Sequence, residues 1–87
     1  MSRCYQAVCR TGDEAYDAFH ATEDIFDHIG EVTGYARKRC AESLLWRFDD
    51  DLPVVERMLD ALRATGLFTD VRPISDQLFS ITRSHAV

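Results

Sequence analysis

Turn-forming residues, paired cysteines and long apolar runs are all scarce in this sequence of 87 residues. With only four glycines and two prolines, and with 46% hydrophobic residues, the composition is that of a packed globular chain and excludes a disordered one. No apolar run approaches the ~20 residues that span a bilayer, and residues 1–4 lack the apolar core of a secretion signal. We therefore expect one small cytosolic domain over residues 1–87.

The cysteines are too few for a disulfide scaffold. Cys4, Cys9 and Cys40 are an odd number, and a secreted domain of this size would carry more, in pairs. Cys4 and Cys9 point to opposite faces of a regular strand. His20 and His28 lie about 12 Å apart along a helix, too far to share one metal ion without other ligands. We expect reduced, mostly buried thiols, no metal and no cofactor.

Signatures of catalysis are also missing. No acid/base pair or phosphate-binding loop stands out, which argues against an enzyme. Cys40 follows three basic residues, 37–39, that favour a thiolate, but a nucleophile also needs a nearby base. The same basic residues beside Tyr35 are the only hint of direct nucleic-acid binding, and they do not match the RNA-recognition consensus. Capping of the following helix explains the acidic residues 49–51 better than magnesium binding does.

The first two predicted elements are a strand and a long helix. Residues 3–10, RCYQAVCR, contain aromatic and β-branched side chains and are ended by Thr11 and a glycine, which is typical of a strand. Thr11 and Glu14 have the spacing of a capping box, so a helix should begin there. Apolar side chains then recur at steps of three and four as far as Ile29, and Gly30 is typical of a helix end.

A change of period after this helix predicts a β-hairpin. The runs EVTGYARKR and SLLWRFD flank residues 40–42 and are rich in aromatic and β-branched residues. The alternative is that residues 35–43 continue as helix and that only residues 44–48 form a strand. Leu44, Trp46 and Phe48 share one face of that strand, which should point at the helices.

The remaining elements complete an α+β pattern. Asp51 is placed to cap a helix with Pro53 in its first turn, and Gly66 is placed to end it. Two short strands, FTDVRPI and QLFSITR, should follow around residues 75–76. The order of elements resembles the ferredoxin-like βαββαβ sandwich with an extra C-terminal strand, in which two helices cover one face of an antiparallel sheet. That fold hosts many unrelated functions.

The most unusual segment is TGDEAYDAFHATEDIFDHIGE, residues 11–31, which has seven carboxylates and no lysine or arginine. On one continuous helix most of these carboxylates, with His20, step by three and four and form a solvent-facing ridge roughly 27 Å long. Acids near the helix start are favourable, but the later ones crowd the negative end of the dipole and repel one another. The predicted partner-binding residues are Asp13, Asp17, Glu23, Asp24, Asp27 and Glu31.

Three interpretations of this acidic segment are open. The first is a solvated face that keeps the protein soluble, with residues 37–39 folding back onto the helix end. The second is an adaptation to salt, but residues 37–87 are charge-neutral, which argues against it. The third is a docking surface for a basic partner, on which carboxylates imitate phosphates. The third makes the protein a non-enzymatic interaction module. It would act as an inhibitor or adaptor on a nucleic-acid-binding assembly, of the kind that phages encode against host defence systems.

A different class of function is a dimeric ligand-sensing or regulatory module. The sheet face away from the helices must be polar or covered, and Leu45, Val71, Phe79 and Ile81 are candidates for that face. If they are exposed there, the apolar patch predicts a homodimer through the sheets. A small enzyme is the second alternative.

Overall fold

The computed structural model describes residues 2–28 and 32–84, which form a small α+β domain. Its elements, in chain order, are β1 (Arg3–Val8), α1 (Gly12–Ala21), α2 (Glu23–His28), β2 (Tyr35–Cys40), β3 (Ser43–Phe48), α3 (Leu52–Ala64), β4 (Asp70–Ile74) and α4 (Asp76–Ile81). None of the helices in the described residues is long and apolar enough to cross a membrane.

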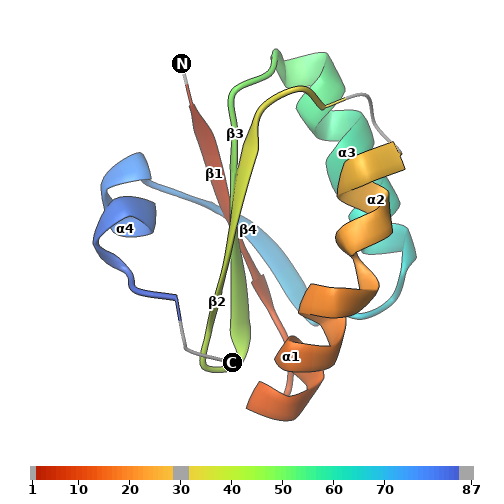
Figure 1. The fold of residues 1–87 in the computed structure, drawn as a ribbon, viewed down its shortest axis with the longest axis vertical. Helices are drawn as coiled ribbons and strands as arrows, with labels where there is room; N and C mark the ends of the chain where they lie inside the picture. The colour runs from red at the N-terminus through yellow and green to blue at the C-terminus, as the bar shows by residue number, and fades with distance from the viewer. Residues whose placement is uncertain (1, 29–31, 85–87) are drawn as a thin grey trace.

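The four strands form one antiparallel sheet in the order β2-β3-β1-β4. At its centre Ala7 of β1 lies opposite Leu44 of β3 on one side and Val71 of β4 on the other. Figure 1 shows α1, α2 and α3 on one face of the sheet and α4 on the other. The predicted hairpin is confirmed, because residues 35–40 and 43–48 pair as strands, and the helical alternative for residues 35–43 is excluded.

The core lies between the sheet and the three helices on its first face. Leu44, Trp46 and Phe48 of β3 are fully buried there, as the alternation along this strand predicts. Phe26 of α2 stacks parallel to Phe48 with ring centres 5.8 Å apart, which attaches the short helix to the sheet. The close packing of these large side chains holds α2 against β3.

The third helix has the predicted ends. Asp51 occupies the N-cap position and a proline lies in the first turn, although the Asp51 side chain makes no capping hydrogen bond. Val55, Met58 and Leu62 are fully buried, which confirms the apolar stripe. Gly66 follows the helix with a φ of +73°, a left-handed conformation that favours glycine.

The prediction of one long helix after Thr11 is wrong. The start is confirmed, since the Glu14 amide donates to Thr11 Oγ1 over 3.1 Å, but α1 ends at Ala21 and α2 begins at Glu23. Thr22 lies between them with a fully buried side chain, and its hydroxyl donates to the carbonyl oxygen of Ala18 over 2.7 Å. Such a bond back to the preceding turn bends a helix, and the apolar stripe gave no sign of it. The predicted end at Gly30 lies outside the described residues.

The extra C-terminal strand is also a wrong prediction, because residues 76–81 form α4. Ser75 Oγ accepts a hydrogen bond from the Leu78 amide over 3.0 Å, which is an N-cap, and it outweighs the alternating pattern of QLFSITR. The helix covers the outer face of the sheet, which is the face opposite α1, α2 and α3. Its one buried side chain is Phe79, which is 2% exposed.

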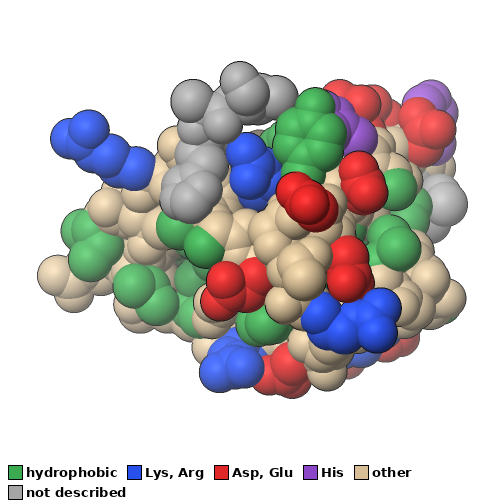
Figure 2. Space-filling view, turned by 90° about the horizontal axis from the view of Figure 1, so that it is seen from below, with side chains coloured by type: hydrophobic (Ala, Val, Ile, Leu, Met, Phe, Trp, Pro, Cys, Tyr) green, Lys and Arg blue, Asp and Glu red, His purple; other side chains and the backbone are tan. Residues whose placement is uncertain are grey.

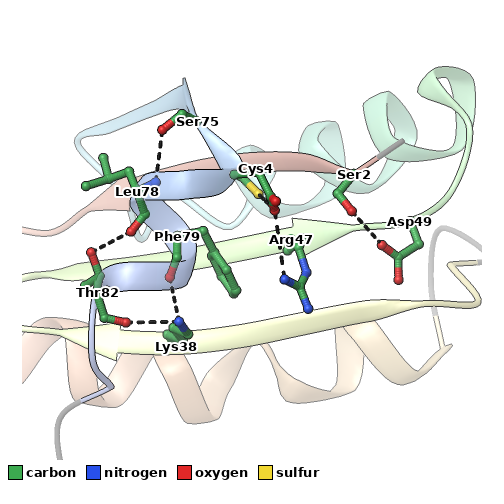
Figure 3. A network of polar contacts seen from close by, with 10 residues as sticks. Ser2, Cys4, Lys38, Arg47, Asp49, Ser75, Leu78, Phe79 and Thr82 are labelled. Carbon is green, nitrogen blue, oxygen red and sulfur yellow. Dashed lines mark hydrogen bonds and ion pairs between the residues drawn. The ribbon is translucent and has the colours of Figure 1, made fainter.

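Lys38 from β2 holds the end of α4 (Figure 3). Its Nζ donates to the carbonyl oxygens of Phe79 and Thr82 over 2.5 and 2.9 Å, and it lies 4.3 Å from the centre of the Phe79 ring. A cation at this position satisfies carbonyls that the helix end leaves unpaired.

The outer sheet face is therefore not an open apolar surface. Leu45 is on this face, as expected, but it packs against Phe79 and only 4% of it is exposed. Val71 belongs instead to the core on the opposite face. Of the four residues that suggested a dimer, Ile81 alone is widely exposed, at 70%.

Candidate protein-binding surface

The predicted partner-binding residues lie on two helices. Asp13 and Asp17 are on α1, Glu23, Asp24 and Asp27 are on α2, and all five side chains are exposed. Glu31 lies outside the described residues. Figure 2 views the end of the molecule where α1 lies and shows exposed Asp and Glu side chains beside hydrophobic and His ones. We call Asp13, Asp17, Glu23, Asp24 and Asp27 the acidic surface.

The acidic surface has a different shape from the predicted ridge. The break at Thr22 divides it between α1 and α2, so the carboxylates do not follow the line of one continuous helix. The two parts remain joined by backbone hydrogen bonds across the break, from the amides of Ile25 and Phe26 to the Thr22 carbonyl. The acidic surface therefore consists of two adjoining segments whose relative direction the break determines.

Several of these charges have no hydrogen-bond or ion-pair partner among the described residues. In the part of the chain that the structure describes, the carboxylates of Asp13, Asp17 and Asp24 take part in no hydrogen bond or ion pair. Asp27 does have a partner, because the Tyr35 hydroxyl donates to it over 2.9 Å. This bond, with burial second, raises the pKa of Tyr35. The surface thus offers three unengaged carboxylates to a ligand.

The basic residues of β2 do fold back toward these helices, but not onto the carboxylates. Arg37 enters the break between α1 and α2, where its guanidinium donates to the carbonyl oxygen of Phe19 and, over 3.1 Å, to Thr22 Oγ1. It also lies 4.3 and 4.9 Å from the ring centres of Phe19 and Phe26. Burial lowers the pKa of Arg37, and the charge of Glu23 opposes this shift most.

This placement removes the only basic stripe that suggested nucleic-acid binding. Arg37 points to the face of the sheet that carries α1 and α2, and Lys38 points to the face that carries α4. Each is used to hold a helix. A continuous row of cations along β2, which a phosphate backbone would require, is therefore not formed.

An exposed aromatic pair lies within the acidic surface. The rings of Tyr16 and His20, one turn apart on α1, meet edge to face with centres 4.7 Å apart. Tyr16 is 39% exposed, and the Arg39 guanidinium lies 5.4 Å from its ring centre. Exposed tyrosine is enriched at protein interfaces. No role for Tyr16 was predicted from the sequence, although its spacing from Asp13 and His20 places it on the same face.

The cysteines do not form a site. Cys4 and Cys9 are buried on opposite sides of the sheet, Cys40 is half-buried, and all three are reduced thiols. Burial, followed by a hydrogen bond to Asp76 over 3.5 Å, raises the pKa of Cys4 to about 11. No group of three potential metal ligands occurs among the residues that the structure describes.

Asp50 has a structural role in the loop before β2. Its carboxylate accepts hydrogen bonds from the amide and hydroxyl of Thr33 and from the Gly34 amide, over 2.8–3.3 Å. Burial tends to raise the pKa of Asp50, but these three bonds together lower it. The acidic run before α3 thus stabilises the loop that leads into β2.

Comparison of the chain with protein-family models, curated proteins and solved structures found no match. The candidate surface is therefore defined by its own geometry. It can attract cations, accept hydrogen bonds and bury an aromatic ring, which are the properties of a protein-binding surface.

Proposed function

We propose that this chain is a cytosolic protein–protein interaction module whose acidic surface docks on a basic partner. The partner class that fits is a protein with an Arg- or Lys-lined groove, such as a nucleic-acid-binding protein. Occupation of that groove by carboxylates would make the chain an inhibitor or an adaptor.

One observation carries the proposal: α1 and α2 present exposed carboxylates with no lysine or arginine on either helix. Mutual repulsion of such charges costs roughly 0.2–0.5 kcal/mol per pair, and a single lysine would remove part of that cost. The exposed Tyr16 supports the same function, because an aromatic side chain among charges supplies the apolar contact that charges alone lack.

The test uses charge reversal at two residues whose side chains make no hydrogen bond or ion pair with the described residues. Asp13→Lys combined with Asp24→Lys changes the acidic surface without breaking a hydrogen bond of the fold. The matched control, Glu56→Lys with Asp60→Lys, makes the same change in net charge on the exposed side of α3. Tagged forms of the three proteins are used to capture proteins from a cell extract at low and high salt.

The proposal requires a basic protein that the wild type and the α3 control capture and the α1–α2 variant does not. Its capture should weaken as salt increases, because exposed charges are screened within about 10 Å at 0.1 M salt. Equal loss of capture in the two variants would assign the binding to net charge alone, and equal capture by all three proteins would show that these charges are not needed. Either result would refute the acidic surface as the site.

We also propose that the architecture is a ferredoxin-like split βαβ arrangement. The support is that β1 lies between β3 and β4 while β3 lies between β1 and β2, all antiparallel. Each helical connection, from β1 to β2 and from β3 to β4, then joins strands that have one other strand between them. An experimental structure with another strand order would reject this assignment.

A further inference from the structure

A cavity adjoins the acidic surface at the start of α1. Arg10, Glu14 and Asp17 form one wall and residues 66–69, the loop from α3 to β4, form the other, around a volume of about 440 Å³. Pockets of this size hold small ligands, so one long side chain fits. The cavity is concave, whereas the rest of the acidic surface is an exposed helix face.

The loop wall is held in place by bonds to the end of β1. The amide and the hydroxyl of Thr69 both donate to the Val8 carbonyl oxygen, over 2.8 and 3.1 Å, and the Cys9 thiol donates to the Leu67 carbonyl oxygen over 3.6 Å. Gly66 adds room, because no atom lies within 4 Å of the place where a Cβ would be. The walls are therefore preorganised, which reduces the entropic cost of binding.

The charge of the cavity favours a cation. Arg10 Nε lies 3.2 Å from Glu14 Oε1, so these two charges largely offset each other. The Asp17 carboxylate takes part in no hydrogen bond or ion pair of the described residues and remains as the excess charge. Both of its oxygens are free to accept hydrogen bonds from one ligand group.

The opposite wall is apolar. Leu67 is 38% exposed, and half-buried Phe68 is held edge-on against Trp46 with ring centres 5.3 Å apart. An arginine side chain has the matching parts: an aliphatic stem for Leu67, and a planar guanidinium that packs on an aromatic ring and binds a carboxylate with two parallel hydrogen bonds. Lysine has a point charge in place of the planar fork, and it matches less well.

We infer that this cavity receives an arginine side chain of the basic partner. The inference rests on the proposed function and gives it an anchor residue, since a single buried arginine surrounded by weaker contacts commonly dominates a protein interface. The site itself can be tested without the partner, because a capped arginine carries the same groups.

The probe is N-acetyl-arginine amide, titrated into ¹⁵N-labelled protein while the amide resonances are followed by NMR. N-acetyl-citrulline amide is the matched probe, since it keeps the stem and the shape and lacks the charge. We expect arginine to shift the amides of residues 66–69 and of Asp17 with an affinity in the millimolar range, and citrulline to bind about tenfold or more weakly.

Two variants locate the contact. Asp17→Asn should weaken arginine binding about tenfold, which is the loss expected for a charge-assisted hydrogen-bonded pair. Glu56→Gln makes the same charge change on the exposed side of α3, outside the cavity and outside the acidic surface, and should leave the affinity within about twofold. Equal weakening by the two variants, equal binding of the two probes, or shifts distributed over α2 would overturn the inference.

The outcomes also separate this inference from the function on which it rests. Arginine binding with no basic partner captured would leave a site for a small guanidinium ligand and refute the docking function. Partner capture with no arginine binding would retain the function and refute the cavity as its anchor.

Discussion

Arg37 of β2 donates a hydrogen bond to Thr22 Oγ1 over 3.1 Å at the point where α1 ends and α2 begins. The same guanidinium bonds the Phe19 carbonyl and lies over the Phe19 and Phe26 rings, so one strand residue holds both acidic helices. Its Nε is buried and has no hydrogen-bond partner among the described residues. The direction in which the acidic surface faces therefore depends on a half-buried cation.

Substitution of Arg37 tests this dependence. Arg37→Ala should lower the free energy of unfolding by about 2–4 kcal/mol, because it leaves a space between two aromatic rings and unpaired acceptors at Phe19 and Thr22. Arg37→Met should cost less, about 1–2 kcal/mol, since it keeps an apolar stem between the rings while the acceptors at Phe19 and Thr22 stay unpaired. Urea unfolding measures both, and equal losses in the two variants would show that the charge, not the packing, stabilises the break.

Release of α4 should expose a thiol. Phe79→Ala removes the anchor of this helix, so Cys4 should lose its burial and its contact with Asp76, and its pKa should fall from about 11 toward the ordinary 9.0. The thiolate fraction near neutral pH then rises by up to about a hundredfold. The measurement is the rate of iodoacetamide modification of Cys4, read by mass spectrometry of the peptide that contains it.

Leu78→Ala is the control for this experiment, because Leu78 lies on the same helix and its side chain is 42% exposed. The rate of Cys4 modification in Leu78→Ala should equal that in the wild type. If Phe79→Ala also leaves the rate unchanged, then Lys38 and the Ser75 cap hold α4 without the aromatic anchor.

The hydrogen bonds to Asp50 predict that the folded state loses stability in acid. The pKa of Asp50 is lowered below its ordinary 3.8 in the folded state, so the stabilisation is present above that value and is lost as pH falls through the folded-state pKa. We expect the urea midpoint of the wild type to decrease over this acidic range and that of Asp50→Asn to change less. Parallel pH profiles would contradict the role assigned to the three bonds from Thr33 and Gly34.

The sequence was sufficient for the elements whose signals are local. Thr11 and Gly66 delimit helices because capping and a left-handed turn depend on one or two residues, and Trp46 faces the core because alternation fixes its side of the strand. The break between α1 and α2 could not be predicted in this way. Nothing in the periodicity distinguishes Thr22 as the end of α1, since the bend depends on a hydroxyl that turns back to Ala18 and on Arg37 from another element.

Only part of the candidate site could be predicted from the sequence. The carboxylates of the acidic surface are exposed as the helical pattern requires, because an amphipathic helix buries one stripe and solvates the other. The cavity beside Asp17 was not predictable, because its second wall comes from residues 66–69, and only the fold brings that loop to α1. Likewise, the strand expected near Phe79 became a helix through the cap at Ser75.

The most direct test of the docking function is the affinity of the captured basic partner, measured by calorimetry for the wild type and for the two charge-reversal pairs at one salt concentration. Asp13→Lys with Asp24→Lys should weaken binding by about tenfold or more, because like charges then face each other across the interface. Glu56→Lys with Asp60→Lys should stay within about threefold of the wild type. Equal weakening by the two pairs would contradict the account and leave the carboxylates of α1 and α2 as a solubilising surface.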